Sequence, residues 1–158
     1  MAKRLLLLAA KFLIITVPLG LIWIEWARTA YLNLFVKIAT PVLLLFGVQD
    51  IFGKYVVDHF INYVPFLVLI VITPELSPKR RIVGGVIGFF LLFVGHIVLT
   101  TIAYYAIHNY GQTQKAFSVL FPGFLLNDSL PFIIWAIVAS GWLKQLLGSL
   151  KKTEPAGR

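Results

Sequence analysis

Residues 82–107 read IVGGVIGFFLLFVGHIVLTTIAYYAI, an apolar run without Asp, Glu, Lys or Arg. As a helix it would reach about 39 Å at 1.5 Å per residue, more than the roughly 30 Å hydrocarbon core of a bilayer. The basic triplet KRR at 79–81 precedes the run, and Tyr104 and Tyr105 lie near its end, where aromatic residues favour a membrane interface. The run therefore predicts a transmembrane helix whose basic end faces the cytoplasm.

The whole chain has the composition of an integral membrane protein. Of its 158 residues, 59% are hydrophobic and only 13% are charged, whereas soluble domains carry about a quarter charged residues. A soluble domain of this size could not bury so much apolar surface. We predict a single helical bundle over residues 1–150, followed by a disordered polar tail at 151–158.

The net charge of +8 does not indicate nucleic-acid binding. The basic residues cluster at the ends of apolar runs, as the positive-inside rule and contact with anionic lipid headgroups predict. We expect the lipid bilayer and another membrane protein as partners, and no nucleic acid. The absence of cysteine excludes disulfides, thiolate metal sites and a cysteine nucleophile.

Three further apolar segments precede residues 82–107 in the chain. Leu5–Trp26 begins like a signal peptide but lacks a small-residue cleavage site, which predicts an uncleaved signal anchor. Tyr31–Val48 is short, with Lys37 and Pro41 inside it, and a polar linker separates it from His59–Thr73.

A mixed loop and a final apolar segment follow residues 82–107. We expect the loop over His108–Phe124, because it contains Gly111, Pro122 and Gly123. The last helix then ends at Lys144. Its predicted start has three N-cap candidates and a proline in the first turn: Asn127, Asp128, Ser129 and Pro131.

The basic clusters at 3–4, 79–81 and 144–152 should all be cytoplasmic. The chain must then cross an even number of times between the first two clusters, so one of three segments does not span. Tyr31–Val48 is the best candidate because of Lys37 and Pro41. We predict an all-α inner-membrane protein with cytoplasmic termini, four transmembrane helices and one interfacial or re-entrant helix. The alternative has five spans and an external N-terminus.

Small and polar residues recur on one face of the 82–107 helix, which predicts a close-packed seam. Within this face His96 has two possible roles. The favoured one is a hydrogen bond to a neighbouring helix, and the other is proton transfer or substrate orientation. The predicted packing face consists of Gly84, Gly88, Gly95, His96 and Thr100.

Most other charged or titratable residues are expected on the outer side. Glu25 and Arg28 are spaced to pair on a helix, whereas Asp58 and His59 are adjacent and could pair only in a cap conformation. A metal site formed by two histidines and Asp128 would lack tight ligand spacing, and we predict no metal. The predicted outer polar cluster is Glu25, Arg28, Asp58, His59, His108 and Asp128.

No phosphate loop, nucleophile elbow, zinc-protease motif or dinucleotide fingerprint occurs in the sequence. We therefore predict no cofactor. No catalytic residue is assigned, and the candidates for one are His96, His59 and Asp128.

Part of the chain resembles the small multi-span membrane proteins associated with the exosortase/archaeosortase group. The resemblance covers about a third of the chain, Asp58–Tyr105, and rests on an Asn before an apolar run, a Thr-Pro stop, a basic turn and a late histidine. These elements are Asn62–Pro65, Leu67–Ile72, Thr73-Pro74, Lys79-Arg80-Arg81 and His96. Exosortases use a Cys nucleophile assisted by Arg and His, and this chain has no Cys. The resemblance implies a non-catalytic companion in envelope protein sorting, with His96 retained for structure.

We therefore expect a non-catalytic accessory or interaction subunit of the inner membrane. One alternative is a small integral-membrane enzyme that acts on a lipid or lipid-linked substrate at the outer leaflet through His59, His96 or Asp128. A second alternative is a small carrier or channel component, although no continuous intramembrane charge relay supports transport.

Overall fold

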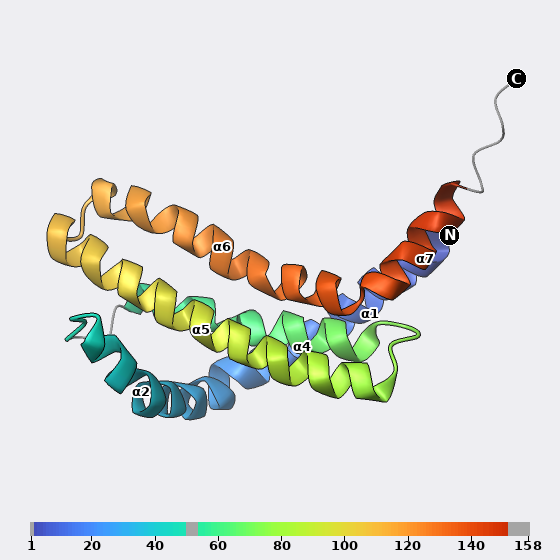
Figure 1. Ribbon diagram of the computed structural model, residues 1–158, viewed down its shortest axis with the longest axis horizontal. Coiled ribbons are helices and arrows are strands. Elements are labelled where there is room, and N and C mark those ends of the chain that lie inside the picture. The colour runs from blue at the N-terminus through green and yellow to red at the C-terminus, as the bar shows by residue number, and fades with distance from the viewer. Residues whose placement is uncertain (1, 50–53, 152–158) are drawn as a thin grey trace, which may run out of the picture.

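The computed structural model describes residues 2–49 and 54–151, and every regular element in these ranges is a helix, which confirms the predicted all-helical class. Residue 151, predicted to begin the tail, is the last residue of the final helix, and residues 152–158 lie outside the described ranges. In chain order (Figure 1) the elements are α1 (Ala2–Ile22), the π-helical turn η1 (Trp23–Ala27), α2 (Arg28–Leu45), α3 (Lys54–Val57), the 3₁₀ segment η2 (Asp58–Asn62), α4 (Tyr63–Ile72), α5 (Pro78–Tyr110), α6 (Gln114–Val138) and α7 (Ser140–Lys151).

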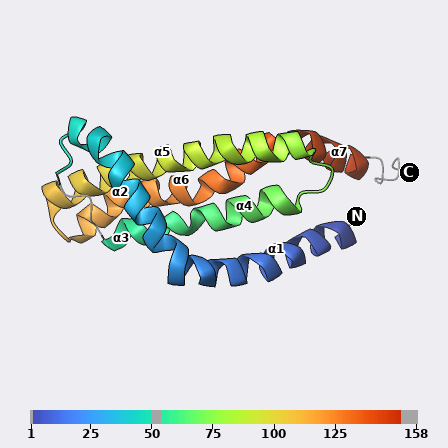
Figure 2. The ribbon, with the colours of Figure 1, turned by 90° about the horizontal axis from the view of Figure 1, so that it is seen from below.

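Four helices, α1, α4, α5 and α6, lie side by side along the long axis of the molecule (Figures 1 and 2). α4 contacts the other three, and α5 and α6 form an extensive antiparallel pair. The N-terminus, α7 and the turn at residues 73–77 lie at one end, here called the basic end. The turn at residues 111–113 and α3 lie at the other, here called the distal end.

The two predicted N-terminal segments form one helical run, because α1, η1 and α2 follow one another without a break. The linking residues 27–30 (ARTA) contain neither Gly nor Pro, so nothing in them ends a helix. The π-helical turn lies where the run changes direction, and α2 then crosses the distal part of the bundle (Figure 2). α2 buries a stripe of residues four apart, Tyr31, Phe35, Ala39 and Leu43.

The predicted loop at His108–Phe124 is wrong. α5 continues to Tyr110, and only three residues separate it from α6. Gly111 ends α5 with a φ of 61°, and the side chain of Thr113 caps α6 by accepting a hydrogen bond from the Ala116 N–H. The predicted cap at Asn127, Asp128 and Ser129 is therefore also wrong, and Pro131 lies inside the helix.

Three glycines of α5 bring neighbouring helices close. A Cβ on Gly88 would lie 2.0 Å from Phe66 of α4, and one on Gly84 or Gly95 would lie 2.6 Å from Val138 or 2.7 Å from Leu130 of α6. The predicted packing face of α5 thus lies inside this chain, and it is not available to a partner. Thr100, also on this face, is buried and donates to the His96 carbonyl.

The turn at the basic end is tied to both flanking helices. Ser77 caps α5, whose first residue is Pro78, and the Arg81 side chain donates to the carbonyls of Leu76 and Thr73. The Trp135 indole N–H of α6 donates to the Thr73 hydroxyl at 2.7 Å. These contacts hold α4, α5 and α6 together at the same end.

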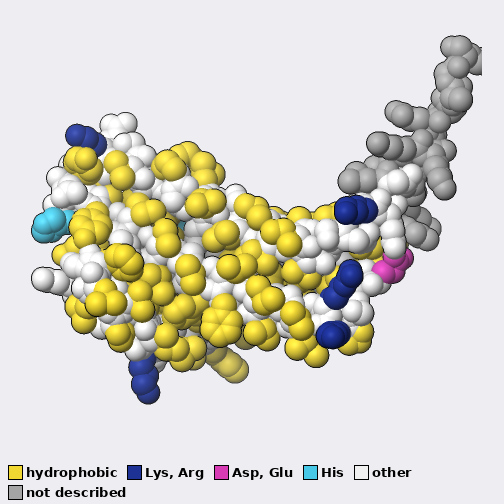
Figure 3. Space-filling view, in the orientation of Figure 1, with side chains coloured by type: hydrophobic (Ala, Val, Ile, Leu, Met, Phe, Trp, Pro, Cys, Tyr) yellow, Lys and Arg dark blue, Asp and Glu magenta, His cyan; other side chains and the backbone are white. Residues whose placement is uncertain are grey.

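Among the described residues, three helical stretches are long and apolar enough to cross a membrane: Leu6–Leu45, Pro78–Tyr110 and Gln114–Val138. Asp58–Ile72 is apolar but shorter. By this measure the described residues contain three membrane-length helices rather than the predicted four plus one, because the two N-terminal segments merge and the third predicted segment is short. Figure 3 shows hydrophobic side chains over most of one face, with a group of basic side chains towards the basic end.

Candidate functional site

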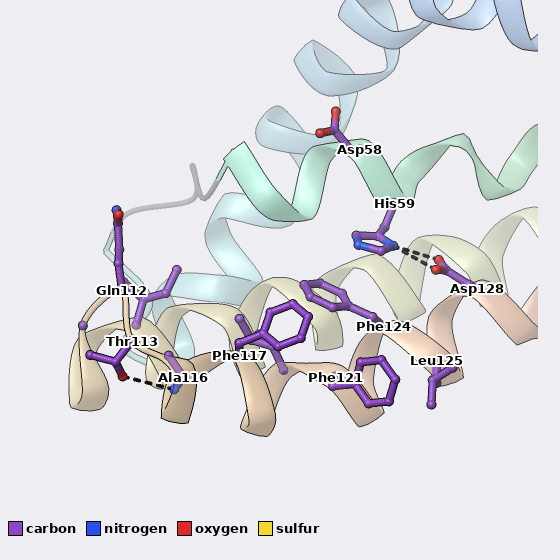
Figure 4. Close-up of a pocket in the computed structure, with 13 residues that line it drawn as sticks. Asp58, His59, Gln112, Thr113, Ala116, Phe117, Phe121, Phe124, Leu125 and Asp128 are labelled. Atoms are coloured by element: carbon purple, nitrogen blue, oxygen red, sulfur yellow. Dashed lines mark hydrogen bonds and ion pairs between the residues drawn. The ribbon is translucent and has the colours of Figure 1, made fainter.

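A cavity of about 580 Å³ opens at the distal end between η2, the end of α5 and the first half of α6 (Figure 4). Its wall is mainly apolar, and several polar side chains lie at its rim. We call it the distal cavity. Its lining residues are Asp58, His59, Ile107, Gly111, Gln112, Thr113, Ala116, Phe117, Leu120, Phe121, Phe124, Leu125 and Asp128.

His59 and Asp128 form a hydrogen-bonded pair at the edge of the distal cavity, although they are 69 residues apart (Figure 4). The Nδ1 atom of His59 lies 3.0 Å from both carboxylate oxygens. The ring also stacks on Phe124, with centroids 4.1 Å apart and planes inclined by 11°. An ionised carboxylate only accepts hydrogen bonds, so Nδ1 of His59 donates to Asp128, and in the neutral form of the ring Nε2 presents a lone pair.

Asp58 also lines the cavity, but it pairs with Arg28 at 3.3 Å. The anticipated Glu25–Arg28 pair is thus replaced by a contact between η2 and the start of α2. The alternative pairing of Asp58 with His59 is likewise replaced, since each binds a residue of another helix. The exposed fraction of the Asp58 side chain is 69%, so this ion pair is solvated and contributes little to stability.

His96 lies at the centre of a second, buried polar group. Its Nδ1 atom is 2.7 Å from the Tyr31 hydroxyl, and its Nε2 atom is 2.9 Å from Oδ1 of Asn62. Phe60 stacks on the ring with centroids 4.1 Å apart, and His96 is 0% exposed. Tyr63 completes the group, with its hydroxyl 3.2 Å from that of Tyr31 and donating to the Phe89 carbonyl.

The hydrogen-bond directions determine the tautomer of His96. The amide N–H of Asn62 donates to the Asn127 carbonyl, so Oδ1 of Asn62 faces His96 as an acceptor. The Nε2 atom must therefore carry the proton, and Nδ1 accepts from the Tyr31 hydroxyl. Both ring nitrogens are satisfied within the protein, and neither reaches the distal cavity.

A proline makes the link between Asn62 and Asn127 possible. Pro131 has no N–H, so the carbonyl four residues before it, that of Asn127, has no helical partner. The Asn62 side-chain amide donates a hydrogen bond to that carbonyl, with its nitrogen 3.1 Å from the oxygen. The Asn127 amide in turn donates to the His59 carbonyl at 3.3 Å and to Asp128 at 3.4 Å. The buried network of Tyr31, Asn62, Tyr63, His96 and Asn127 is thereby connected to the cavity edge.

The predicted outer polar cluster is only partly assembled. Arg28 meets Asp58 and His59 meets Asp128, whereas His108 stacks on Tyr104 with centroids 5.7 Å apart. Glu25 lies in η1. Within residues 2–49 and 54–151, no three His, Asp or Glu side chains form a group that could hold a metal ion.

Sequence reasoning missed Tyr31 and the role of Asn127. Tyr31 was read only as the start of an apolar segment, and Asn127 only as a helix cap. The available signal was the cost of polar groups within apolar runs, which also drew attention to His96. No family model, curated protein or solved structure matches the chain.

Proposed function

We propose that this chain is a non-catalytic accessory subunit of an inner membrane, linked to envelope protein sorting, that binds another membrane protein. The proposal is supported above all by the enclosure of His96. His96 belongs to the stretch that resembles the exosortase-associated proteins, and both its ring nitrogens are bonded within the fold. A fully buried ring without a free nitrogen suits a structural role better than proton transfer to a substrate.

In the membrane, we propose four crossings with both termini in the cytoplasm. α3, η2 and α4 are continuous over Lys54–Ile72, about 28 Å at 1.5 Å per residue, and they lie beside α1, α5 and α6 (Figure 2). The N-terminus and the basic residues 79–81 at the start of α5 share the basic end, as the positive-inside rule requires. α2 then lies across the outer side of the bundle.

The proposed partner surface is the outer face of α1. Within α1 the half-buried positions recur four residues apart, at Phe12, Thr16 and Gly20, and this stripe faces α4. The opposite side carries exposed apolar residues such as Ile14, Val17 and Leu21. A helix bound along only one narrow stripe leaves a long apolar face for another transmembrane helix.

Site-specific photocrosslinking in the native host tests this proposal. A photoreactive residue at Ile14 or Val17 is expected to give one discrete protein adduct, identified by mass spectrometry as a component of envelope protein sorting. The matched control is Phe12, on the stripe facing α4, which should crosslink within the chain. Deletion of the chain should leave an envelope precursor unsorted. The proposal fails if the exposed positions yield only lipid adducts, or if deletion changes no envelope protein.

A second candidate function is an enzyme that acts on a lipid-linked substrate, and the His59–Asp128 pair favours it. A carboxylate on Nδ1 orients the ring and leaves Nε2 as a base at the edge of an apolar cavity. Replacement of a general base costs about a hundredfold or more in rate. His59→Gln should therefore abolish sorting if the chain is the enzyme, and should complement the deletion if it is an accessory subunit.

A further inference from the structure

We infer that the distal cavity binds one phospholipid with a primary-ammonium headgroup, such as phosphatidylethanolamine, with an acyl chain inside and the ammonium at the rim. The inference rests on the proposed placement of the distal end at the membrane surface. It does not depend on whether the chain is a subunit or an enzyme.

The wall of the cavity suits a hydrocarbon chain. Three phenylalanines one turn or less apart on α6, Phe117, Phe121 and Phe124, line it together with Leu120 and Leu125. Phe117 and Phe121 are about half exposed, at 57% and 48%, so this apolar surface has no covering element within the described residues. At about 580 Å³, the cavity falls within the usual size range of small-molecule sites.

The rim selects for a hydrogen-bond donor with positive charge. The Asp128 carboxylate is half exposed, at 52%, and can accept further hydrogen bonds beyond those from His59 and Asn127. In its neutral form His59 also presents the Nε2 lone pair, since Nδ1 donates to Asp128. Asp58 adds a second, more exposed carboxylate, which pairs with Arg28 through one oxygen and leaves the other free to accept. Acceptors beside an apolar wall complement an ammonium group that carries an acyl chain, and they repel an anionic headgroup.

Lipids with three different headgroups distinguish the contribution of the positive charge from that of the N–H donors. Phosphatidylethanolamine has an ammonium with N–H donors, phosphatidylcholine has the same charge without N–H groups, and phosphatidylglycerol has no cation. Native mass spectrometry of the purified chain in mild detergent, with each lipid at matched acyl composition, gives relative affinities. We expect phosphatidylethanolamine to bind about tenfold more tightly than phosphatidylcholine, and phosphatidylglycerol to bind most weakly.

Two variants test the rim and the wall separately. Asp128→Asn should reduce the preference for phosphatidylethanolamine to about twofold or less, whereas Glu75→Gln, the same charge change at the basic end, should preserve it. Leu125→Trp should fill the cavity and weaken the binding of all three lipids. Its matched control is Leu126→Trp, because the two leucines are similarly exposed, at 55% and 59%, and only Leu125 lines the cavity.

Equal binding of the three lipids by the unmodified chain would overturn the inference, as would unchanged binding in Leu125→Trp. It is also overturned if a photoreactive residue at Leu125 labels only a protein and no lipid co-purifies. The lipid-binding measurements use the isolated chain, so they remain decisive even if no protein adduct forms at α1. Conversely, an adduct at α1 without lipid selectivity would support the subunit proposal and remove only this inference.

Discussion

Asn62 and Asn127 join two helices through a carbonyl that Pro131 leaves without an intrahelical partner. The 3.1 Å bond holds the Asn62 amide in the one orientation that offers Oδ1 to His96. A proline in the middle of α6 is therefore part of the reason why a histidine can be buried in α5. Because each polar group depends on the next, the loss of one member should affect the whole buried network.

Asn62→Ala should destabilise the protein by about 1–2 kcal/mol, because it leaves the Nε2 proton of His96 and the Asn127 carbonyl unpaired in the interior. The free energy of unfolding in detergent micelles measures the effect. Asn33→Ala is the control, since Asn33 is exposed on α2, and it should change stability by less than about 0.5 kcal/mol. Equal effects of the two substitutions would show that the network is not formed.

A double-mutant cycle should reveal coupling between Tyr31 and His96. Tyr31→Phe removes the donor to Nδ1, and His96→Leu removes the acceptor, so each leaves a buried partner unsatisfied. The double variant should be more stable than the sum of the two effects predicts, by about 0.5–2 kcal/mol. Additive effects would contradict the 2.7 Å bond between the two side chains.

Gly88→Ala should cost about 1–3 kcal/mol, because the new methyl group would overlap the buried ring of Phe66. Gly85→Ala is the matched control in the same helix, since a Cβ there meets nothing within 4 Å. It should be neutral or stabilise by up to about 1 kcal/mol through helix propensity. Phe66→Leu combined with Gly88→Ala should recover part of the lost stability. If it does not, overlap with the Phe66 ring is not the cause of the loss.

The helical character of the chain and the long helix α5 could be predicted from the sequence, because a charge-free apolar run of that length has few alternatives. The predicted span at 82–107 lies within the observed Pro78–Tyr110. The start of α6 could not be predicted in this way. Gly111, Pro122 and Gly123 indicate a loop and Pro131 a helix start, but packing against α5 keeps residues 114–138 helical despite the two prolines and Gly123.

The site was predictable as a set of residues and not as a set of pairs. His59 and Asp128 were both candidates, yet their contact spans 69 residues and depends on how η2 meets α6. The contact between Tyr31 and His96 requires α2 to fold back over α5, which follows from the π-helical turn at Trp23–Ala27. No local pattern in the sequence indicates that His59 contacts Asp128 or that Tyr31 contacts His96.

The membrane topology can be tested in this chain without background labelling, because it has no cysteine. With four crossings, Cys introduced at Thr29 or Gln114 should react with a membrane-impermeant thiol reagent in intact cells. Cys introduced at Ser77 should react only after permeabilisation. All three positions are exposed in the fold, so burial within the chain does not explain a lack of reaction.

Thr29 distinguishes the two topologies, since the five-span arrangement with an external N-terminus places it in the cytoplasm. Reaction at Gln114 but not at Thr29 in intact cells would therefore replace four crossings with five. Reaction at Ser77 alone would invert the whole molecule, moving the basic turn 79–81 outside against the positive-inside rule and taking the distal cavity away from the outer leaflet.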